Sequence, residues 1–324
     1  MRAIFYHSVI EKRDPSDYYT ANAIEIREFE IHVAELARNW RVLSLYEVAE
    51  IIRQGRPFPK GAVHISFDDG FGNNLYAAEI LDRYKLPWTV SVVVDAILDG
   101  FQPWYMRLAD AITATNNPIR WRRTMYDLSR FEEKWRLAQA VKSAVLAVPA
   151  QGHLMVLDEI LAEAHMVRPE QTNWPFLSLG QLQQLSAAGV EIGNHSARHA
   201  NLVQCCPGEL SYEVGESQRR LEAALNRPIR YFCYPDGQYN ASVMSEVSAS
   251  HELALAGWNS RRPLAPFELR RYSVGPRYED LLEVLSPVYP VRFRYKRLKW
   301  MAKRNIKKAI RRLGFVPTRV SKIF

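Results

Sequence analysis

Two clusters of polar residues have the types and spacing of a metal site. Asp68 and Asp69 are adjacent carboxylates directly before Gly70. In extended backbone, adjacent side chains point to opposite sides, so one carboxylate can bind a cation while the other accepts a proton. An Asp-Asp-Gly segment is also typical of a solvated turn, and this alternative stays open for the segment on its own.

His195 and His199 form the second cluster. At this spacing, two imidazoles on one side of a helical turn can direct their nitrogens at a single cation. Two imidazoles and one carboxylate leave coordination positions open for water, which is the pattern of a catalytic divalent site rather than a structural one. The alternative is a pair of surface histidines near a helix start, and the presence of the two carboxylates weakens it.

Each cluster follows a predicted β-strand. The apolar run 62–67 leads directly into Asp68, and residues 190–193 lead into the histidines. A third strand, 229–234, ends at Pro235-Asp236-Gly237. In parallel α/β folds the carboxyl ends of the strands meet at one edge, where active sites are assembled. We therefore expect these polar residues to lie together.

The spacing of apolar residues predicts the elements between the strands. Helices are predicted over 26–40, 44–53, 75–84 and 209–225, and strands over 3–6 and 88–94. Ser44 is the expected N-cap of its helix, with Glu47 three residues on. Residues 121–170 are mostly helical and more polar, and we interpret them as an insertion that covers the barrel. Strand, helix and strand in alternation indicate a parallel α/β fold.

Three segments resemble, in order, the first three motifs of the polysaccharide deacetylase family (NodB homology, carbohydrate esterase family 4). They are Ser66-Phe67-Asp68-Asp69-Gly70, His195-Ser196-Ala197-Arg198-His199 and Tyr231-Phe232-Cys233-Tyr234-Pro235-Asp236-Gly237. Phe5-Tyr6-His7-Ser8-Val9 and Leu269-Arg270-Arg271 further resemble members from exopolysaccharide loci. The resemblance implies a distorted (β/α)7-type barrel. We expect a catalytic domain over residues 1–290, with a helical insertion at about 105–176.

The resemblance also implies roles for these residues. Asp69, His195 and His199 are expected to bind a divalent metal ion, and Asp68 to act as general base. We expect Zn²⁺, although Co²⁺, Ni²⁺ and Fe²⁺ suit the same ligands. The backbone N–H of Asp236 is expected to stabilise the oxyanion, since the family uses the N–H at this position of the third motif.

A general acid is also required, because the leaving amine must be protonated. The usual late motif Leu-x-Ile/Val-x-His is not visible near the C-terminus. His7 resembles the acid of family members with permuted strand order, and the alternative is a buried, hydrogen-bonded histidine. The five histidines outside the matched positions are predicted to be structural or exposed: His32, His64, His153, His165 and His251.

Two positions depart from the family pattern. Cys233 stands where many members carry an arginine that orients the base, and Arg271 is expected to hold Asp68 instead by a charge-assisted bond. The alternative for Arg271 is an ordinary surface cation. Asp236 replaces a residue that is usually aromatic, which adds a negative charge and removes a surface for sugar stacking. Cys233 itself is predicted to be a small buried residue rather than a nucleophile.

Aromatic residues near the strand ends are candidates for sugar binding. Trp104 and Tyr105 follow a predicted strand, and Tyr234 lies in the third motif. Aromatic faces can stack on sugar rings, but large aromatic side chains also bury most of their area in folded cores. Core packing is therefore the alternative for Trp104 and Tyr105.

The charge of the chain is concentrated at its C-terminal end. The net charge is +8, and residues 291–324 hold 13 Lys or Arg and no Asp or Glu, which leaves 30 basic and 35 acidic residues before them. This distribution argues against a nucleic-acid-binding core. Apolar residues recur three or four positions apart over 295–313, which predicts a basic amphipathic helix that binds an anionic membrane surface. Packing on the barrel and binding of an acidic polymer are the alternatives.

These observations predict a metal-dependent hydrolase that removes an N-acetyl group from an amino sugar in a polysaccharide or a lipid-linked glycan. A deformylase or another amidase of non-peptide C–N bonds, and a non-catalytic carbohydrate-binding relative, are the alternatives. The chain has no long apolar run and no secretory signal at its start, and its three cysteines make a poor disulfide framework. We expect it in the cytoplasm, peripherally on the inner face of the membrane.

Overall fold

Parallel strands and helices alternate along most of the chain. The computed structural model describes residues 1–14, 16–166, 172–257, 260, 262, 264–287 and 289. The first compact unit is Met1–Tyr278, and a second unit begins at Glu279. The barrel and the residues discussed below belong to the first unit.

Seven parallel strands close into a barrel. Their order around the ring is β1 (Arg2–Tyr6), β12 (Leu269–Ser273), β11 (Leu253–Ala256), β10 (Tyr231–Cys233), β9 (Glu191–Asn194), β6 (Thr89–Val92) and β5 (Ala62–Phe67), and β5 pairs back with β1. Ile4 in β1 lies beside Ile65 on one side and Tyr272 on the other. A short strand, β4 (Arg41–Val42), pairs with the first two residues of β5. The predicted (β/α)7-type barrel is confirmed.

Two helices around the barrel show the buried face and the N-cap that the sequence indicates. α1 (Ile26–Asn39) buries Phe29, Val33 and Leu36, which lie three or four residues apart on one face. α2 (Leu45–Arg53) begins at Ser44, whose Oγ accepts a hydrogen bond from Glu47 N at 3.1 Å, while Glu47 Oε2 accepts one from Ser44 N at 2.9 Å. Further barrel helices are α3 (Asn74–Arg83), α4 (Val94–Asp99), α8 (Leu179–Ala187) and α11 (Ala241–Ser250).

The helix predicted over 209–225 contains a wider turn. It consists of α9 (Pro207–Ser211), a π-helical turn η4 (Tyr212–Glu216) and α10 (Ser217–Leu225). Short elements complete the unit: strands β2 (Ser8–Ile10) and β3 (Ala23–Glu25), and 3₁₀ turns η1 (Tyr18–Asn22), η3 (Leu202–Gln204) and η5 (Pro235–Gly237). π-helical turns are rare and are often found at functional sites. This one lies against the loop that follows β9, as described below.

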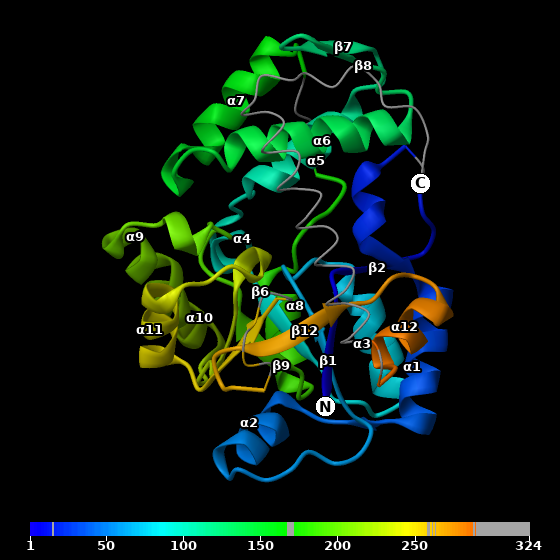
Figure 1. Ribbon diagram of the computed structural model, residues 1–324, viewed down its shortest axis with the longest axis vertical. Helices are drawn as coiled ribbons and strands as arrows, with labels where there is room; N and C mark the ends of the chain where they lie inside the picture. The colour runs from blue at the N-terminus through cyan, green and yellow to red at the C-terminus, as the bar shows by residue number, and fades with distance from the viewer. Residues whose placement is uncertain are drawn as a thin grey trace, which may run out of the picture. The chain divides into compact units, whose positions relative to one another are not determined.

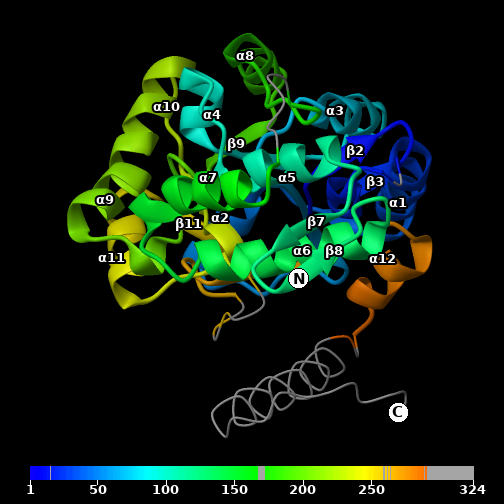
Figure 2. The same ribbon diagram turned by 90° about the horizontal axis from the view of Figure 1, so that it is seen from above.

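The insertion is mostly helical, as predicted, and lies over the carboxyl ends of the strands. It contains α5 (Trp104–Ala114), β7 (Ile119–Trp121), β8 (Thr124–Tyr126), α6 (Phe131–Val145), η2 (Ala150–Gly152) and α7 (His153–Glu163). In Figure 1, β1 runs upward from the N-terminus, and the green helices α5, α6 and α7 lie above the barrel. Seen from above in Figure 2, they cross the centre of the ring of helices. The hairpin of β7 and β8 was not predicted.

The insertion has an apolar core of its own. Buried residues of its three helices, among them Leu137, Val141 and Leu157, form one cluster with Tyr19 and Phe71 from the barrel side. This shared cluster fixes the insertion over the barrel opening. Apolar burial stabilises this attachment by about 25 cal/mol for each Å² removed from water.

Two expectations concern residues near the C-terminal end. The predicted boundary at residue 290 and the basic segment 291–324 lie outside the described residues. α12 (Tyr278–Leu285) is the last described helix. Among the described helices, none combines the length and the apolar character that crossing a membrane requires.

Candidate metal and catalytic site

The predicted polar residues lie at the carboxyl ends of four barrel strands. His7 follows β1, Asp68 and Asp69 follow β5, and His195 follows β9. Asp236 lies in the turn after β10. Because all of these strands are parallel, their ends open on the same side of the barrel, beneath the insertion.

Asp69, His195 and His199 converge on one point. Asp69 Oδ1 lies 3.6 Å from His195 Nε2 and 3.6 Å from His199 Nε2. The same Oδ1 is buried and has no hydrogen-bond partner among the described residues. A buried carboxylate oxygen without a partner is costly unless a cation satisfies it. A carboxylate and two imidazoles within 4.8 Å of one another are a donor set that fits Zn²⁺ and similar divalent ions.

The surroundings of His195 prepare its Nε2 as a ligand. Its Nδ1 lies 2.8 Å from the backbone carbonyl of Cys233, so Nδ1–H donates and the Nε2 lone pair faces Asp69. Burial lowers the pKa of His195 to about 4, which outweighs the opposing influence of Asp68. The imidazole is therefore neutral at neutral pH, the form that binds metal.

Asp68 is held by Arg271 through two parallel hydrogen bonds. Arg271 Nη1 donates to Asp68 Oδ1 at 2.5 Å and Nη2 donates to Oδ2 at 2.8 Å. Burial disfavours the ionised carboxylate, but Arg271 and His195 more than offset it and hold the pKa of Asp68 well below its ordinary range. Phe5 lies under the guanidinium, with its ring centre 4.5 Å from Arg271 Cζ. Arg271 is thus a buried partner of Asp68 and not a surface cation.

Backbone strain marks the same loops. Four residues of the site have left-handed φ values without being glycine: Asp69 at 71°, Ser196 at 66°, His199 at 56° and Asp236 at 52°. Each costs about 1–2 kcal/mol relative to a right-handed conformation. Gly70 at 82° is required as glycine, because a Cβ there would lie 2.7 Å from Val92 Cγ1. Strain of this kind persists only where surrounding contacts impose it.

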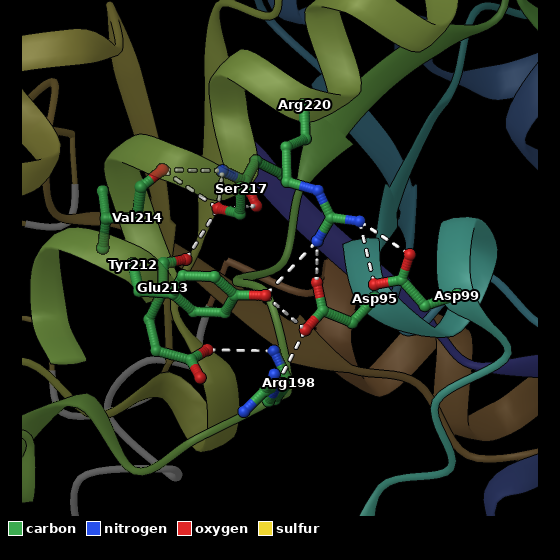
Figure 3. A network of polar contacts seen from close by, with 9 residues as sticks. Asp95, Asp99, Arg198, Tyr212, Glu213, Val214, Ser217 and Arg220 are labelled. Atoms are coloured by element: carbon green, nitrogen blue, oxygen red, sulfur yellow. Dashed lines mark hydrogen bonds and ion pairs between the residues drawn. The ribbon is translucent and has the colours of Figure 1, made fainter.

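The π-helical turn supplies such contacts to the loop that carries both histidines. The backbone carbonyl of Glu213 accepts a hydrogen bond from Ala197 N at 3.0 Å. The side-chain Oε2 of Glu213 accepts another from Arg198 N at 2.9 Å. Figure 3 shows the Glu213 carboxylate beside Arg198. Ser196 Oγ accepts a further bond from His199 N at 3.0 Å. These bonds hold His199 in its left-handed conformation.

A cavity of about 230 Å³ opens in front of Asp69 and His199. The predicted site residues that line it are His7, Asp69, Trp104, Tyr105, His199 and Asp236. Trp104 lines this cavity and also packs in the apolar cluster of the insertion, so core packing is observed and its contact with sugar stays a prediction. The Tyr105 ring lies 4.8 Å from the His199 ring, centre to centre. Burial and the neighbouring Asp69 carboxylate raise the pKa of Tyr105 well above its ordinary value.

Tyr234 is not brought to this cavity. Its side chain is fully buried in an apolar cluster with Phe232, and its hydroxyl donates to the carbonyl of Phe267 at 3.2 Å. Side chains alternate along a strand, so Phe232 and Tyr234 point one way and Cys233 the other. The predicted contact of Tyr234 with sugar was wrong for this reason.

The residues predicted to be structural are mostly buried, and Cys233 lies next to the site, with its Sγ 3.5 Å from Asp68 Oδ1. Cys233 is buried, and burial raises the pKa of its thiol well above the ordinary value, so it remains protonated. All three cysteines are free. Four of the five remaining histidines are buried, namely His32, His64, His153 and His251, and His165 is exposed.

Several residues around the cavity were missed by the sequence analysis. Lys142 of α6 lies 3.2 Å from Asp236 Oδ1 and pairs with it. Trp135, Gln139 and Lys142 line the cavity from α6, and Tyr18 and Tyr19 line it from η1. The positions in α6 recur three or four residues apart, which indicates one helical face. That pattern could have identified this face of α6 from the sequence, although it does not show which part of the molecule the face covers.

Comparison with known proteins agrees with this fold. Residues 158–255 match the family described as polysaccharide deacetylase. The solved structure of deacetylase PplD from Streptococcus pyogenes is 16% identical, with a TM-score of 0.59 over 89% of this chain and 98% of that chain. IcaB from Ammonifex degensii is 14% identical, with a TM-score of 0.55 over 89% of this chain and 96% of that chain.

Among curated proteins, YlxY of Bacillus subtilis is 22% identical over 86 residues. The match covers 26% of this chain and 27% of that protein, so it spans about a quarter of the length of either. At these identities, the similarity to the solved structures shows a shared fold. The match to the family profile adds the segment that contains β9 and β10, with both histidines and the third motif.

Proposed function

Because this chain belongs to the polysaccharide deacetylase family, we propose that it is a metal-dependent hydrolase that removes an N-acetyl group from an amino sugar of a polysaccharide or a lipid-linked glycan. The observation that carries the proposal is the convergence of Asp69, His195 and His199 around one buried carboxylate oxygen that has no hydrogen-bond partner among the described residues. Asp68 lies next to them as a second carboxylate.

Asp69, His195 and His199 would hold the divalent ion. When bound, such an ion acidifies water and polarises the acyl carbonyl. Two imidazoles and one carboxylate leave coordination positions for the water and for the acyl carbonyl, which a closed structural site does not. The cavity beside these ligands is lined by Trp104 and Tyr105, whose aromatic surfaces suit the apolar faces of a sugar ring.

Asp68 would accept the proton of the attacking water. It remains ionised at neutral pH because Arg271 stabilises the carboxylate. A carboxylate oxygen of Asp68 and a ring nitrogen of His195 lie within 4.8 Å of each other, so Asp68 can reach the coordination sphere of the ion. Arg271 also fixes the direction of the carboxylate, because the two hydrogen bonds are parallel.

Two further groups would act on the substrate. The backbone N–H of Asp236 would donate to the oxyanion, and Lys142 offsets the negative charge of the Asp236 side chain at that point. His7 lines the same cavity and would protonate the leaving amine. Without that proton the tetrahedral intermediate returns to the amide.

Acetate release from N-acetylglucosamine oligomers tests this function. We expect release by the metal-loaded protein, a loss of at least about 100-fold in Asp68→Asn, and no loss in Asp82→Asn, whose carboxylate is exposed on α3. Retained activity in Asp68→Asn would remove the proposed base. A protein that binds the oligomers but releases no acetate, with or without Zn²⁺, is a carbohydrate-binding relative.

A lipid-linked substrate is the further part of this proposal, and it rests on the basic segment 291–324. Each cation near an anionic leaflet adds about 1 kcal/mol of attraction. Flotation with phosphatidylserine vesicles, before and after deletion of 291–324, measures this attraction. Equal flotation of both proteins would remove the membrane part and leave the hydrolase unaffected.

A further inference from the structure

The hydroxyl of Tyr105 is a buried hydrogen-bond donor that the fold itself does not use. Tyr105 lies in the first turn of α5 and lines the cavity in front of Asp69 and His199. Its Oη is shielded from solvent and has no hydrogen-bond partner among the described residues. A buried hydroxyl without a partner costs free energy, so its presence in a native fold calls for an explanation. Its place in the wall of the cavity indicates that the partner is a ligand.

A second buried atom without a partner belongs to the same cavity. It is Asp69 Oδ1, which accepts hydrogen bonds, whereas a phenol hydroxyl can donate one. The two atoms do not form a hydrogen bond with each other. A divalent ion would satisfy the carboxylate oxygen, but a cation accepts no hydrogen bond, so the Tyr105 hydroxyl requires another acceptor.

The acyl oxygen of the substrate would supply this acceptor. Burial is the main reason that the pKa of Tyr105 is raised, and the charges of Asp69 and Asp236 raise it further, so the hydroxyl lies near both residues. Asp69 is a proposed metal ligand, and the backbone N–H of Asp236 is the proposed oxyanion donor. The acyl oxygen is expected between these two residues, because both the ion and this N–H would act on it.

The Tyr105 side chain is held in place before a substrate binds. Its ring centre lies 4.8 Å from the centre of the His199 ring and 6.1 Å from that of the Trp104 ring. Buried residues of α5, among them Met106 and Ile112, fix the helix in the apolar cluster of the insertion. Donors that are fixed in advance stabilise developing charge without reorganisation. The placement of Tyr105 therefore suits an oxyanion donor.

We infer that Tyr105 is a catalytic residue whose hydroxyl donates a hydrogen bond to the acyl oxygen of the substrate, as a second oxyanion donor beside the N–H of Asp236. This inference rests on the proposed function, and it concerns the hydroxyl and not the ring face that is expected to contact sugar.

The hydrogen bond from Tyr105 would strengthen during the reaction. Asp68 takes a proton from the attacking water, whose oxygen bonds to the acyl carbon, and the π electron pair of the C=O bond moves to the acyl oxygen. The negative charge on this oxygen makes it a better acceptor, while the Tyr105 proton stays on Oη. The C=O bond then forms again as the C–N electron pair moves to nitrogen, and the amine leaves with the proton from His7.

Tyr105→Phe tests the role of the hydroxyl, because it keeps the ring. We expect kcat for acetate release from N-acetylglucosamine oligomers to fall about 100-fold and KM to stay within about threefold, because the lost hydrogen bond is strongest in the transition state. Tyr46→Phe is the matched control, since Tyr46 is 55% exposed on α2. A fall of less than about tenfold in Tyr105→Phe overturns the inference.

Binding of a tetrahedral analogue gives a readout other than activity. The analogue carries a methylphosphonamidate in place of the N-acetyl group, so its charged oxygens resemble the oxyanion. By calorimetry, we expect Tyr105→Phe to weaken binding of the analogue at least about tenfold. Binding of the unmodified oligomer should change less than about threefold, measured in an Asp68→Asn background that prevents turnover. An equal change for both ligands overturns the inference, because the hydroxyl then does not distinguish the transition state.

Zinc affinity and thermal unfolding separate this role from two structural ones. If the hydroxyl supported Asp69 as a ligand, Tyr105→Phe would weaken zinc binding in competition with a chromogenic chelator, whereas we expect a change of less than about twofold. If the hydroxyl stabilised the fold, the variant would unfold at a lower temperature. We expect an equal or higher one, because the substitution removes a buried hydroxyl without a partner. Weaker zinc binding or a lower unfolding temperature overturns the inference.

Failure of the proposed function has a different result. If the zinc-loaded protein without substitutions releases no acetate, the deacetylase is removed, and the role of Tyr105 is removed with it. If that protein releases acetate and Tyr105→Phe releases it at an equal rate, the deacetylase stands and the role of Tyr105 does not.

Discussion

Arg271 covers both oxygens of the Asp68 carboxylate, at 2.5 and 2.8 Å, and both side chains are almost fully buried. Replacing Arg271 with Met leaves a buried carboxylate without its main partner, so the pKa of Asp68 rises. We predict that kcat/KM at neutral pH falls about 10- to 100-fold and that the acidic limb of the pH profile moves to higher pH. An acidic limb in its original position contradicts the assignment of Asp68 as base.

The same substitution is expected to lower the free energy of unfolding by about 3–5 kcal/mol, the usual effect of breaking a buried pair. The pKa of Asp68 is lower in the folded state, so the pair stabilises the protein above the ordinary Asp pKa and loses this effect as the pH falls. The double variant Asp68→Asn/Arg271→Met should lose less than the sum of the two single variants. Additive losses would mean that the pair is not coupled.

His7→Gln tests the general acid. We predict that kcat falls by about 10²- to 10⁴-fold and that zinc content is unchanged, because His7 is not among the three residues that converge as ligands. Steady-state kinetics and metal analysis check this, with exposed His165→Gln as the control. A loss of zinc together with activity would indicate a structural role for His7.

At Asp236, the backbone N–H and not the carboxylate is expected to contribute to catalysis. Its φ of 52° is tolerated by Asn and disfavoured for a β-branched residue. We predict that Asp236→Asn keeps kcat within about threefold, while Asp236→Val lowers kcat at least about tenfold and destabilises the protein by about 1–3 kcal/mol. Steady-state kinetics and thermal unfolding measure both. An equal loss of kcat in the two variants would assign the role to the carboxylate.

The parts of the site that lie at strand ends were predictable from the sequence. Asp68 and Asp69 follow an apolar run, and His195 and His199 follow another, so the parallel fold alone brings them to one edge. The predicted sugar contact of Tyr234 was wrong because side chains alternate along a strand. Its neighbour Cys233 is the residue that points toward Asp68.

The parts that depend on docking of distant segments could not be predicted. Lys142 reaches Asp236 only because the insertion packs over the barrel, and the periodicity of α6 does not specify that contact. The network around Asp95 joins a helix after β6 to α10, more than 100 positions along the chain. No local pattern in the sequence identifies such a pair, because the free energy that forms it comes from the assembled fold.

Buried histidines should make the protein sensitive to acid. Burial lowers the pKa of His64 to about 4, so the folded state stays unprotonated where the unfolded state binds a proton, between about pH 6.5 and 4. Stability therefore falls as the pH decreases through this window. His64→Asn keeps a donor for the Leu43 carbonyl, which His64 Nδ1 contacts at 2.9 Å, and removes the titration. We predict that the pH slope of the unfolding free energy becomes shallower by up to about 1.4 kcal/mol per pH unit, and an unchanged slope would contradict this.

Asp95 is expected to support the metal ligands from outside the site. Its carboxylate binds Arg198, which is adjacent to His199 in the loop, and its backbone N–H donates to the carbonyl of Ala197 at 2.9 Å. Asp95→Asn keeps the shape of the side chain but removes the negative charge that Arg198 and Arg220 share. We predict a 10- to 100-fold (about 1.4–2.8 kcal/mol) loss of zinc affinity, measured by competition with a chromogenic chelator.

Asp99→Asn is the matched control for this change, because Asp99 is half exposed and pairs with Arg220 from the outer side of the same network. An exposed pair of this kind contributes at most about 1 kcal/mol, and it does not contact the loop of His199. We therefore expect Asp99→Asn to leave zinc affinity within about twofold of the original. If the two substitutions weaken zinc binding equally, the effect comes from the net charge of the network, and Asp95 does not position the ligand loop.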